Sequence, residues 1–216
     1  MLVVDTEGWV KSPIVTLNPC GAIEHSPIAT INAIVLHRTD STTASSVLSA
    51  WQSKKEGAHF LISENGTIYQ TASLIKQCWH VGKIYSKCRT TSSCSEEDAK
   101  AIEEILKRKN TNWGNKFRLI TKRELDKSFP DRFPHNHDSL GIEIVGVMTK
   151  QSEIYELPSK VQRDSLFWLL DEVIATYSLT VKNVYAHGQI AHKDKNKSEG
   201  TASLKAYALY KQGAKQ

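Results

Sequence analysis

Three short apolar segments each carry one titratable residue, and this pattern restricts the fold more than any other feature of the chain. His37 directly follows residues 31–36 (INAIVL). Glu143 lies inside the run SLGIEIVGV, and the run NVYAH ends at His187. Short apolar runs bounded by polar residues are typical of buried strands. Because a sheet presents the side chains at its strand ends to a cleft, we expect these three residues to converge.

The order of the other signals predicts a mixed architecture. Asn65 and Gly66 stand between two β-prone runs, which is typical of a hairpin, and Ser95 with Asp98 has the spacing of a helix N-terminal cap. Apolar periodicity predicts a further helix over residues 159–179, with Phe167, Leu170, Ile174 and Tyr177 on its core face. The resulting order is strand, helix, hairpin, helix, strand, helix, strand and loop. It favours an α/β (α+β) fold with a central mixed β-sheet flanked by helices.

Two segments fall outside this pattern. Residues 1–30 contain three prolines and are predicted to form an irregular N-terminal extension. The main domain then covers residues 31–216 and is interrupted by an insertion at about 109–137, which is long and polar. Long polar segments between elements are usually functional loops or insertions. We expect both segments to shape a substrate groove.

The charge balance limits the class of partner. The chain has 28 basic and 23 acidic residues, a formal net charge of +5, and basic residues scattered along its length. This mild excess favours anionic partners such as a cell wall, but a dedicated nucleic-acid binder would concentrate its basic residues. No apolar run approaches the roughly 20 residues of a membrane span, and the first residues lack the features of a signal peptide. We therefore expect no nucleic-acid partner and no membrane insertion.

The four cysteines are compatible with two states. No two of them have the CxxC spacing of a zinc knuckle. Cys88 and Cys94 flank a Ser/Thr-rich loop and could close a small ring, but four cysteines allow three full pairings, and four unpaired thiols are an equal alternative. A disulfide would indicate an oxidising place of action.

The residue types at the predicted convergence favour a metal site. Zinc binds histidine nitrogens and carboxylate oxygens, and a catalytic site keeps one position for water. His37, His187 and one carboxylate from the loop after His187 would complete such a set. Glu143 shares one face of its strand with Val145, where an unpaired charge is costly to desolvate. The alternatives are a solvated sheet face for Glu143 and an exposed polar turn for the loop.

Four segments together resemble the zinc-dependent N-acetylmuramoyl-L-alanine amidases of the amidase-2 type, relatives of the peptidoglycan recognition proteins. They are AIVLHRTDS, AHFLISENGTIYQ with CWHVG, DSLGIEIVG, and AHGQIA with NKSEG, in the same order from about residue 31 to residue 200. The resemblance implies His37, His187 and Glu199 as Zn2+ ligands, and Glu143 and Lys197 as catalytic residues. It also implies an amidase-2-like fold for the main domain.

The resemblance is incomplete at the third ligand. The family usually has Asp or Cys where this chain has Glu199, and the loop is about two residues longer here. Asp194 and His192 are therefore alternative ligands.

Three further residues are expected near the substrate. Trp79 and His80 belong to the segment that resembles the family's Trp-His-x-Gly signature, and we expect them in the cleft wall. His59 lines the cleft or, equally, fills a polar position inside the sheet.

The implied reaction is hydrolysis of the amide between N-acetylmuramic acid and L-alanine in bacterial peptidoglycan. Glu143 would take the proton of the attacking water and deliver it to the leaving amine, and Lys197 would stabilise the oxyanion. The competing interpretations are a peptidoglycan-binding module without catalysis and a zinc peptidase that cuts elsewhere in the stem peptide.

Three biological roles are compatible with this chemistry: an antibacterial effector, a phage endolysin and a cell-wall recycling amidase. We expect an effector that acts in the periplasm or cell wall and is delivered by a dedicated machine such as a type VI-like secretion system. The reasons are the missing signal peptide and the potential disulfide. Such a toxin would act on muropeptides as its substrate. It would also need an immunity protein as a partner.

Overall fold

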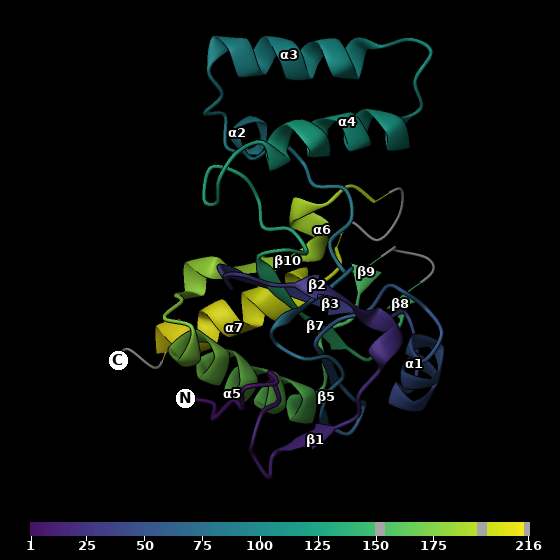
Figure 1. Cartoon of the computed structure of the whole chain (residues 1–216), viewed down its shortest axis with the longest axis vertical. Coiled ribbons are helices and arrows are strands. Elements are labelled where there is room, and N and C mark those ends of the chain that lie inside the picture. The colour runs from purple at the N-terminus through teal and green to yellow at the C-terminus, as the bar shows by residue number, and fades with distance from the viewer. Residues whose placement is uncertain (150–153, 194–197, 214–216) are drawn as a thin grey trace.

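The computed structural model describes residues 1–149, 154–193 and 198–213, and its centre is a six-stranded sheet (Figure 1). The strands are β1 (Val15–Leu17), β2 (Glu24–Pro27), β3 (Ala33–Arg38), β4 (Phe60–Ile62), β5 (Ile68–Gln70), β6 (Lys76–Cys78), β7 (Ser139–Ile144), β8 (Met148–Thr149), β9 (Ile154–Tyr155) and β10 (Val184–Ala186). The order in the sheet is β1-β5-β4-β7-β3-β10, in which β4 and β5 are antiparallel and the other neighbours are parallel. The predicted mixed sheet is thus confirmed.

The chain also contains helices, some of which flank this sheet. They are α1 (Ala44–Trp51), α2 (Lys87–Thr90), α3 (Glu96–Lys107), α4 (Trp113–Leu125), α5 (Lys160–Thr176), α6 (His187–Ile190) and α7 (Thr201–Gly213), with the short 3-10 helices η1 (Gly21–Ile23) and η2 (Val181–Asn183). Helices α5 and α7 contribute to the largest hydrophobic core, and α1 contributes to a second one. Among the described residues, no helix has the length and apolarity needed to cross a bilayer.

The largest core lies between the sheet and α5. Leu166, Leu169, Leu170 and Val173 of α5 are fully buried in the same cluster as strand residues such as Ile142. Burying each such side chain contributes about 1.5–3 kcal/mol relative to its exposure. This packing holds the central strands rigidly, which matters because their ends carry the titratable residues.

The N-terminal segment contributes strands rather than only irregular chain. β1 lies at one edge of the main sheet, where Val15 pairs with Ile68 of β5, and β2 pairs with β6 in a separate two-stranded sheet. Both strands are short and lie close to prolines, so their sequence pattern is weak. The segment before residue 31 is therefore integrated with the main domain.

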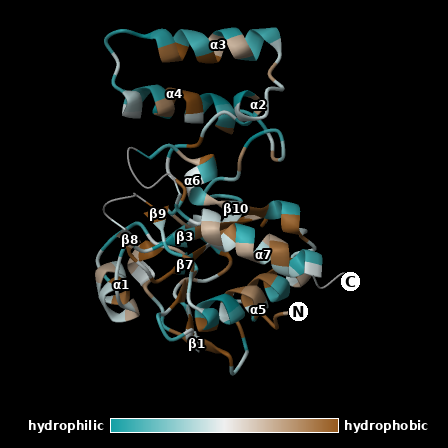
Figure 2. Ribbon diagram, turned by 180° about the vertical axis from the view of Figure 1, so that it is seen from behind, coloured by the Kyte–Doolittle hydropathy of each residue, from teal (hydrophilic) through white to brown (hydrophobic). Residues whose placement is uncertain are grey.

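The largest departure from the expected pattern is a helical hairpin, which we define as residues 83–127. It contains α2, α3 and α4 and projects from the rest of the molecule (Figures 1 and 2). Ile102 and Ile120 are buried in its interior. Arg123 of α4 donates two hydrogen bonds to one carboxylate oxygen of Asp98 in α3, through Nε at 3.0 Å and Nη2 at 2.6 Å.

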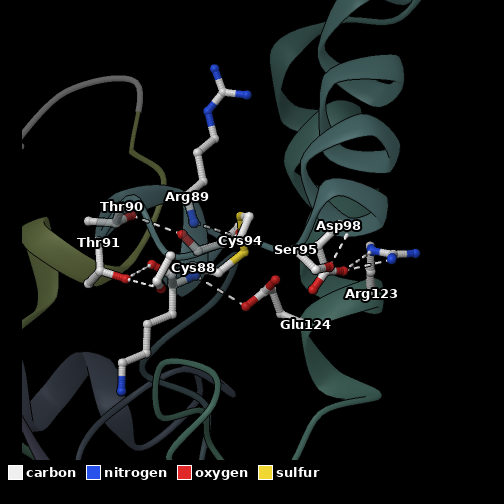
Figure 3. The surroundings of a disulfide bond; sticks show 12 residues. Cys88, Arg89, Thr90, Thr91, Cys94, Ser95, Asp98, Arg123 and Glu124 are labelled. Atoms are coloured by element: carbon white, nitrogen blue, oxygen red, sulfur yellow. Dashed lines mark hydrogen bonds and ion pairs between the residues drawn. A yellow bond between two sulfur atoms is a disulfide. The ribbon is translucent and has the colours of Figure 1, made fainter.

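A disulfide closes the base of the hairpin. Cys88 and Cys94 are bonded, and this joins α2 to the start of α3 (Figure 3). Cys20 and Cys78 are free and buried. The structure therefore has the small ring that the sequence allowed, and it excludes the alternative of four unpaired thiols.

Candidate metal centre and cleft

The sheet register brings the three titratable residues together at the carboxyl ends of three neighbouring strands. His37 of β3 is the cross-strand partner of Glu143 on β7. On the other side of β3, β10 pairs in parallel up to Ala186 and Leu36, so His187 follows at the level of His37. Side chains at the same level of neighbouring strands point to the same face of a sheet. The predicted convergence of these residues is thus a consequence of the register.

Glu199 completes a compact cluster with the two histidines. His37 Nδ1 and His187 Nδ1 each lie 3.0 Å from Glu199 Oε1. All three side chains are buried, and their potential ligand atoms lie within 4.8 Å of one another. Two imidazole nitrogens and one carboxylate oxygen therefore surround a single point in the interior.

A glycine allows the loop that carries Glu199 to approach β3. Gly200 has a φ of +77°, a left-handed conformation that side chains disfavour. A Cβ atom at this position would lie 2.2 Å from the carbonyl oxygen of Leu36. Any residue other than glycine would push the loop away from the strand, and Glu199 would move with it.

The backbone behind the cluster fixes the proton of His187. His187 Nε2 lies 2.8 Å from the carbonyl oxygen of Val81. A carbonyl oxygen only accepts hydrogen bonds, so Nε2 carries the proton in the neutral ring. The lone pair of His187 Nδ1 then faces the Glu199 carboxylate.

His80 fixes the proton of His37 in the same way. His80 Nε2 lies 3.3 Å from the carbonyl oxygen of Ser139 and donates to it, so His80 Nδ1 accepts from His37 Nε2 at 3.0 Å. Gly141 makes room for this ring, because a Cβ there would lie 2.9 Å from His80. The lone pair of His37 Nδ1 therefore also faces Glu199.

Three electron-pair donors thus face one another, which is favourable only with positive charge between them. Burial, with a smaller effect of His187, lowers the pKa of His37 to about 4, so this imidazole is neutral at physiological pH. Glu199 forms an ion pair with Lys193 through Oε2, and this positive charge favours its carboxylate form. Neutral imidazoles and a carboxylate are the donors of catalytic zinc sites. The residues present therefore fit a zinc ion.

Glu143 has the environment of a proton-accepting group. Its Oε2 atom is buried and has no hydrogen-bond partner within the described part of the chain. Burial and the negative charge of Glu199 raise the pKa of Glu143 to about 8, although Lys193 and Arg38 act in the opposite direction. A cation held by the neighbouring cluster would lower this value, because positive charge favours the carboxylate. Glu143 would then be ionised and available as a base.

Two adjoining cavities form the cleft around these groups. One, of about 360 Å³, contains the three cluster residues and Glu143, and the other, of about 450 Å³, extends towards Gly82, Lys83 and His192. The residues that line both cavities are Glu56, Trp79, His80, His187 and Lys193. The predicted positions of Trp79 and His80 in the cleft wall agree with this geometry.

Trp79 is held from outside the cleft by the N-terminal segment. Its side chain is 43% exposed, and its ring stacks on His25 with centroids 3.8 Å apart. His25 lies in β2, which supports the expectation that residues 1–30 shape the groove. Nothing in the sequence pattern singled out this pair.

His59 lies beneath the site rather than in it. It is fully buried, its Nδ1 accepts from the backbone N–H of Gly141 at 3.0 Å, and its Nε2 lies 2.9 Å from the carbonyl oxygen of Lys76. Both ring nitrogens are hydrogen-bonded to backbone groups. Of the two interpretations of His59, the structure has the one in which it fills a polar position in the sheet.

The remaining candidate site residues lie in the loop before α7. His192 stacks on Phe117 of the helical hairpin, with centroids 3.9 Å apart, and is not part of the cluster of potential ligands. Asp194 and Lys197 lie outside the described residues. Lys193, which sequence reasoning did not select, forms an ion pair with Glu199 Oε2. Its only signal was its place among several lysines in this loop.

Comparisons with known proteins agree with this geometry. The family model described as Amidase_2, N-acetylmuramoyl-L-alanine amidase, matches residues 27–200, which is most of the chain. A comparison with curated protein sequences found no match.

Several solved structures are similar in fold. A selenomethionine derivative of AmpD matches with a TM-score of 0.55 and 17% identity, covering 95% of this chain and 99% of that chain. The catalytic domain of XlyA matches with a TM-score of 0.53 and 16% identity, covering 90% and 97% respectively. A mutant endolysin from Bacillus subtilis matches with a TM-score of 0.51 and 17% identity, covering 92% and 98%. At these identities the likeness concerns the fold.

Proposed function

Because the chain belongs to the amidase-2 family of N-acetylmuramoyl-L-alanine amidases, we propose that it hydrolyses the amide between N-acetylmuramic acid and L-alanine in peptidoglycan. The observation that carries this proposal is the buried cluster of His37, His187 and Glu199 beside Glu143. These three residues would hold zinc. When bound, zinc polarises a carbonyl group and lowers the pKa of water towards about 7.

Glu143 would act as the general base and acid of the reaction. Glu143 lines the same cavity as the cluster, and its Oε2 atom has no hydrogen-bond partner among the described residues. It would accept the proton of the attacking water and return it to the nitrogen of the leaving alanine. A second carboxylate would not serve as well, because Glu199 is already engaged by two imidazoles and a lysine.

A lysine would stabilise the negative charge that develops on the carbonyl oxygen. The resemblance assigns this role to Lys197, and the geometry adds Lys193, which lines both cavities. Removing one such donor typically costs about 2.7–4 kcal/mol of transition-state stabilisation. Trp79 and His80 would form the wall against which the substrate lies.

The test is the digestion of a soluble muropeptide by purified, zinc-loaded protein. Mass spectrometry should detect an intact peptide that begins with L-alanine. Glu143→Gln should retain one zinc per chain and lose at least about 100-fold in kcat, as expected for loss of a general base. Cuts inside the stem peptide would identify a peptidase, and binding without cleavage would identify a recognition module.

We propose further that the protein acts in an oxidising compartment as an exported antibacterial effector, with an immunity protein as its partner. The Cys88–Cys94 disulfide supports the compartment, because such bonds persist outside reducing cytoplasm. Expression with and without an added signal peptide tests this role. Lysis only when the protein reaches the periplasm agrees with an effector or an endolysin, and no harm in either place contradicts both.

A further inference from the structure

The helical hairpin is attached to the rim of the cleft. Phe117 of α4 stacks on His192, with ring planes inclined by 13°, and the backbone N–H of His192 donates to the carbonyl oxygen of Lys83 at 2.7 Å. Lys83 and His192 both line the larger cavity. Within the hairpin, the buried Glu124 of α4 accepts a hydrogen bond from the backbone N–H of Lys87 in α2, which joins these two helices. A surface on this hairpin is therefore held beside the active site.

The hairpin carries the entire net charge of the protein. Residues 83–127 contain twelve lysines and arginines and seven acids, a net charge of +5, and the whole chain also has a net charge of +5. The rest of the molecule is neutral overall. The charge is further concentrated within the hairpin, because residues 107–123 contain seven basic residues and no acid.

Most of these basic residues face solvent, and several have no acidic partner. Lys107 pairs with Glu103 and Arg123 with Asp98. Within residues 107–123, the exposed basic residues without an ion pair to any acid in the described ranges are Arg108, Lys109, Arg118 and Lys122. Arg118 and Lys122 are four residues apart on α4 and so share one face. We call these four residues the cationic patch.

The turn between α3 and α4 holds part of the patch in place. Lys116 Nζ donates to the carbonyl oxygen of Leu106 at 2.7 Å and lies 4.6 Å from the centroid of the Trp113 ring. Trp113 is 57% exposed at this end of the hairpin. The turn with Arg108 and Lys109 is thereby tied to the first turn of α4.

We infer that the cationic patch binds polymeric peptidoglycan through the free carboxylates of its stem peptides, and so directs the enzyme to the intact wall rather than to soluble fragments. This inference rests on the proposed function, which makes peptidoglycan the substrate. Several exposed cations on the turn and on α4 suit a polyanion, because many weak contacts add along a repeating ligand. A small fragment offers one or two carboxylates and gains little from such a surface.

The decisive comparison uses two double variants with the same total charge. K109E/K122E reverses two charges of the patch, and K182E/K205E reverses two exposed lysines on other parts of the surface. Both variants lower the net charge by four. Binding is measured by retention of zinc-loaded protein on insoluble sacculi freed of attached phosphate polymers, at low and high salt. Activity is measured separately on a soluble muropeptide.

We expect K109E/K122E to bind sacculi at least about tenfold more weakly and to solubilise them correspondingly more slowly, with cleavage of the soluble muropeptide within about twofold of wild type. K182E/K205E should bind as wild type does. High salt should weaken wild-type binding, because salt screens exposed charges. Equal losses in the two variants would overturn the inference, since net charge alone would then explain them.

A chemical control identifies the ligand. Sacculi whose carboxylates have been converted to amides should retain wild-type protein at least about tenfold less well than untreated sacculi. Undiminished retention on the amidated polymer, or retention only when phosphate polymers are left attached, would also overturn the inference. The inactive E143Q protein should also bind sacculi through the patch, so the inference can be tested even if the soluble muropeptide is not cleaved. Failure of the proposed function is therefore distinguishable from failure of the inference.

Discussion

Lys193 and Lys197 compete for one chemical role, and single substitutions separate them. Lys193 pairs with Glu199 and lines both cavities, so it is a candidate for stabilising the charge that develops on the substrate. We expect K193M to lower kcat/KM about 100-fold, which corresponds to the loss of one oxyanion donor. Zinc content, measured by metal analysis, should stay at one per chain.

K197M is the matched control for this prediction. If K197M loses activity about 100-fold while K193M stays within a fewfold of wild type, the role belongs to Lys197, as the family resemblance implies. A loss of zinc in K193M would instead show that this lysine acts on Glu199 alone.

His59 should make the stability of the protein sensitive to acid. Burial lowers the pKa of His59 to about 4, whereas the imidazole of an unfolded chain has its ordinary pKa of about 6.5. Between these values the unfolded state binds a proton that the native state does not, so the free energy of unfolding falls as the pH falls. From pH 7 to pH 5 this residue should account for about 2 kcal/mol.

Urea unfolding of chelator-treated protein at pH 7 and pH 5 measures this effect. In H59Q the fall between the two pH values should be smaller than in wild type by about that amount, even if the variant is less stable at both. An unchanged fall in H59Q would show that other groups cause the acid sensitivity.

The positions of the site residues were predictable only where a strand fixes them. His37, Glu143 and His187 follow from apolar runs whose ends must lie at one edge of the sheet. Glu199 depends on a loop whose approach requires the left-handed Gly200, and no periodicity reveals such a contact. His59 was ambiguous because its strand is buried on both faces, so alternation does not show which way the ring points.

At the scale of elements, prediction succeeded where one pattern dominates. The hairpin at Asn65-Gly66 is present as β4 and β5, and Ser95 accepts a hydrogen bond from the backbone N–H of Asp98 at the start of α3. α5 is also present, but the observed core face differs from the expected face of Phe167, Leu170, Ile174 and Tyr177. The fully buried apolar residues are Leu166, Leu169, Leu170 and Val173. The difference arises because residues 166–170 are all apolar or aromatic, so the periodicity allows more than one face.

α4 was not predicted, and its composition explains why. It lies within the segment expected to be a polar insertion, and its N-terminus depends on Asn112, whose side chain accepts from the backbone N–H of Asn115 at 2.8 Å. Only a narrow apolar stripe with Ile120 is buried against α3. A helix with so little buried surface has a weak hydrophobic pattern.

The Cys88–Cys94 disulfide should stabilise the base of the helical hairpin. Closing a ring with a sequence separation of six residues restricts the unfolded chain, which by loop entropy amounts to about 2 kcal/mol. In C88S/C94S we therefore expect a lower thermal midpoint and faster tryptic cleavage within residues 83–127. Differential scanning fluorimetry and timed digestion measure these two effects.

Reductant provides the control for this prediction. It should lower the midpoint of the wild-type protein to about that of C88S/C94S and should leave the double variant unchanged. A reductant effect of equal size in the double variant would point to another cause, and an unaltered midpoint in C88S/C94S would contradict the prediction.

At the scale of the whole molecule, the metal cluster joins distant parts of the chain. His37 and Glu199 are 162 residues apart in sequence, and they meet with His187 in one buried cluster. An ion that binds only this assembled site stabilises the native state, by about 2.7 kcal/mol at a free concentration 100 times its dissociation constant. The effect should be large because the ion also relieves the repulsion among three lone-pair donors.

We therefore expect zinc to raise the thermal midpoint of chelator-treated wild-type protein and also of E143Q, since Glu143 is not among the clustered ligand atoms. In E199Q the increment should be largely lost, because the amide oxygen is a weaker ligand than a carboxylate. H192A and D194A should keep the full increment. Loss of the zinc effect in either of these two variants, with its retention in E199Q, would move the third ligand to that residue. The native fold would then close around the metal through a different part of the loop.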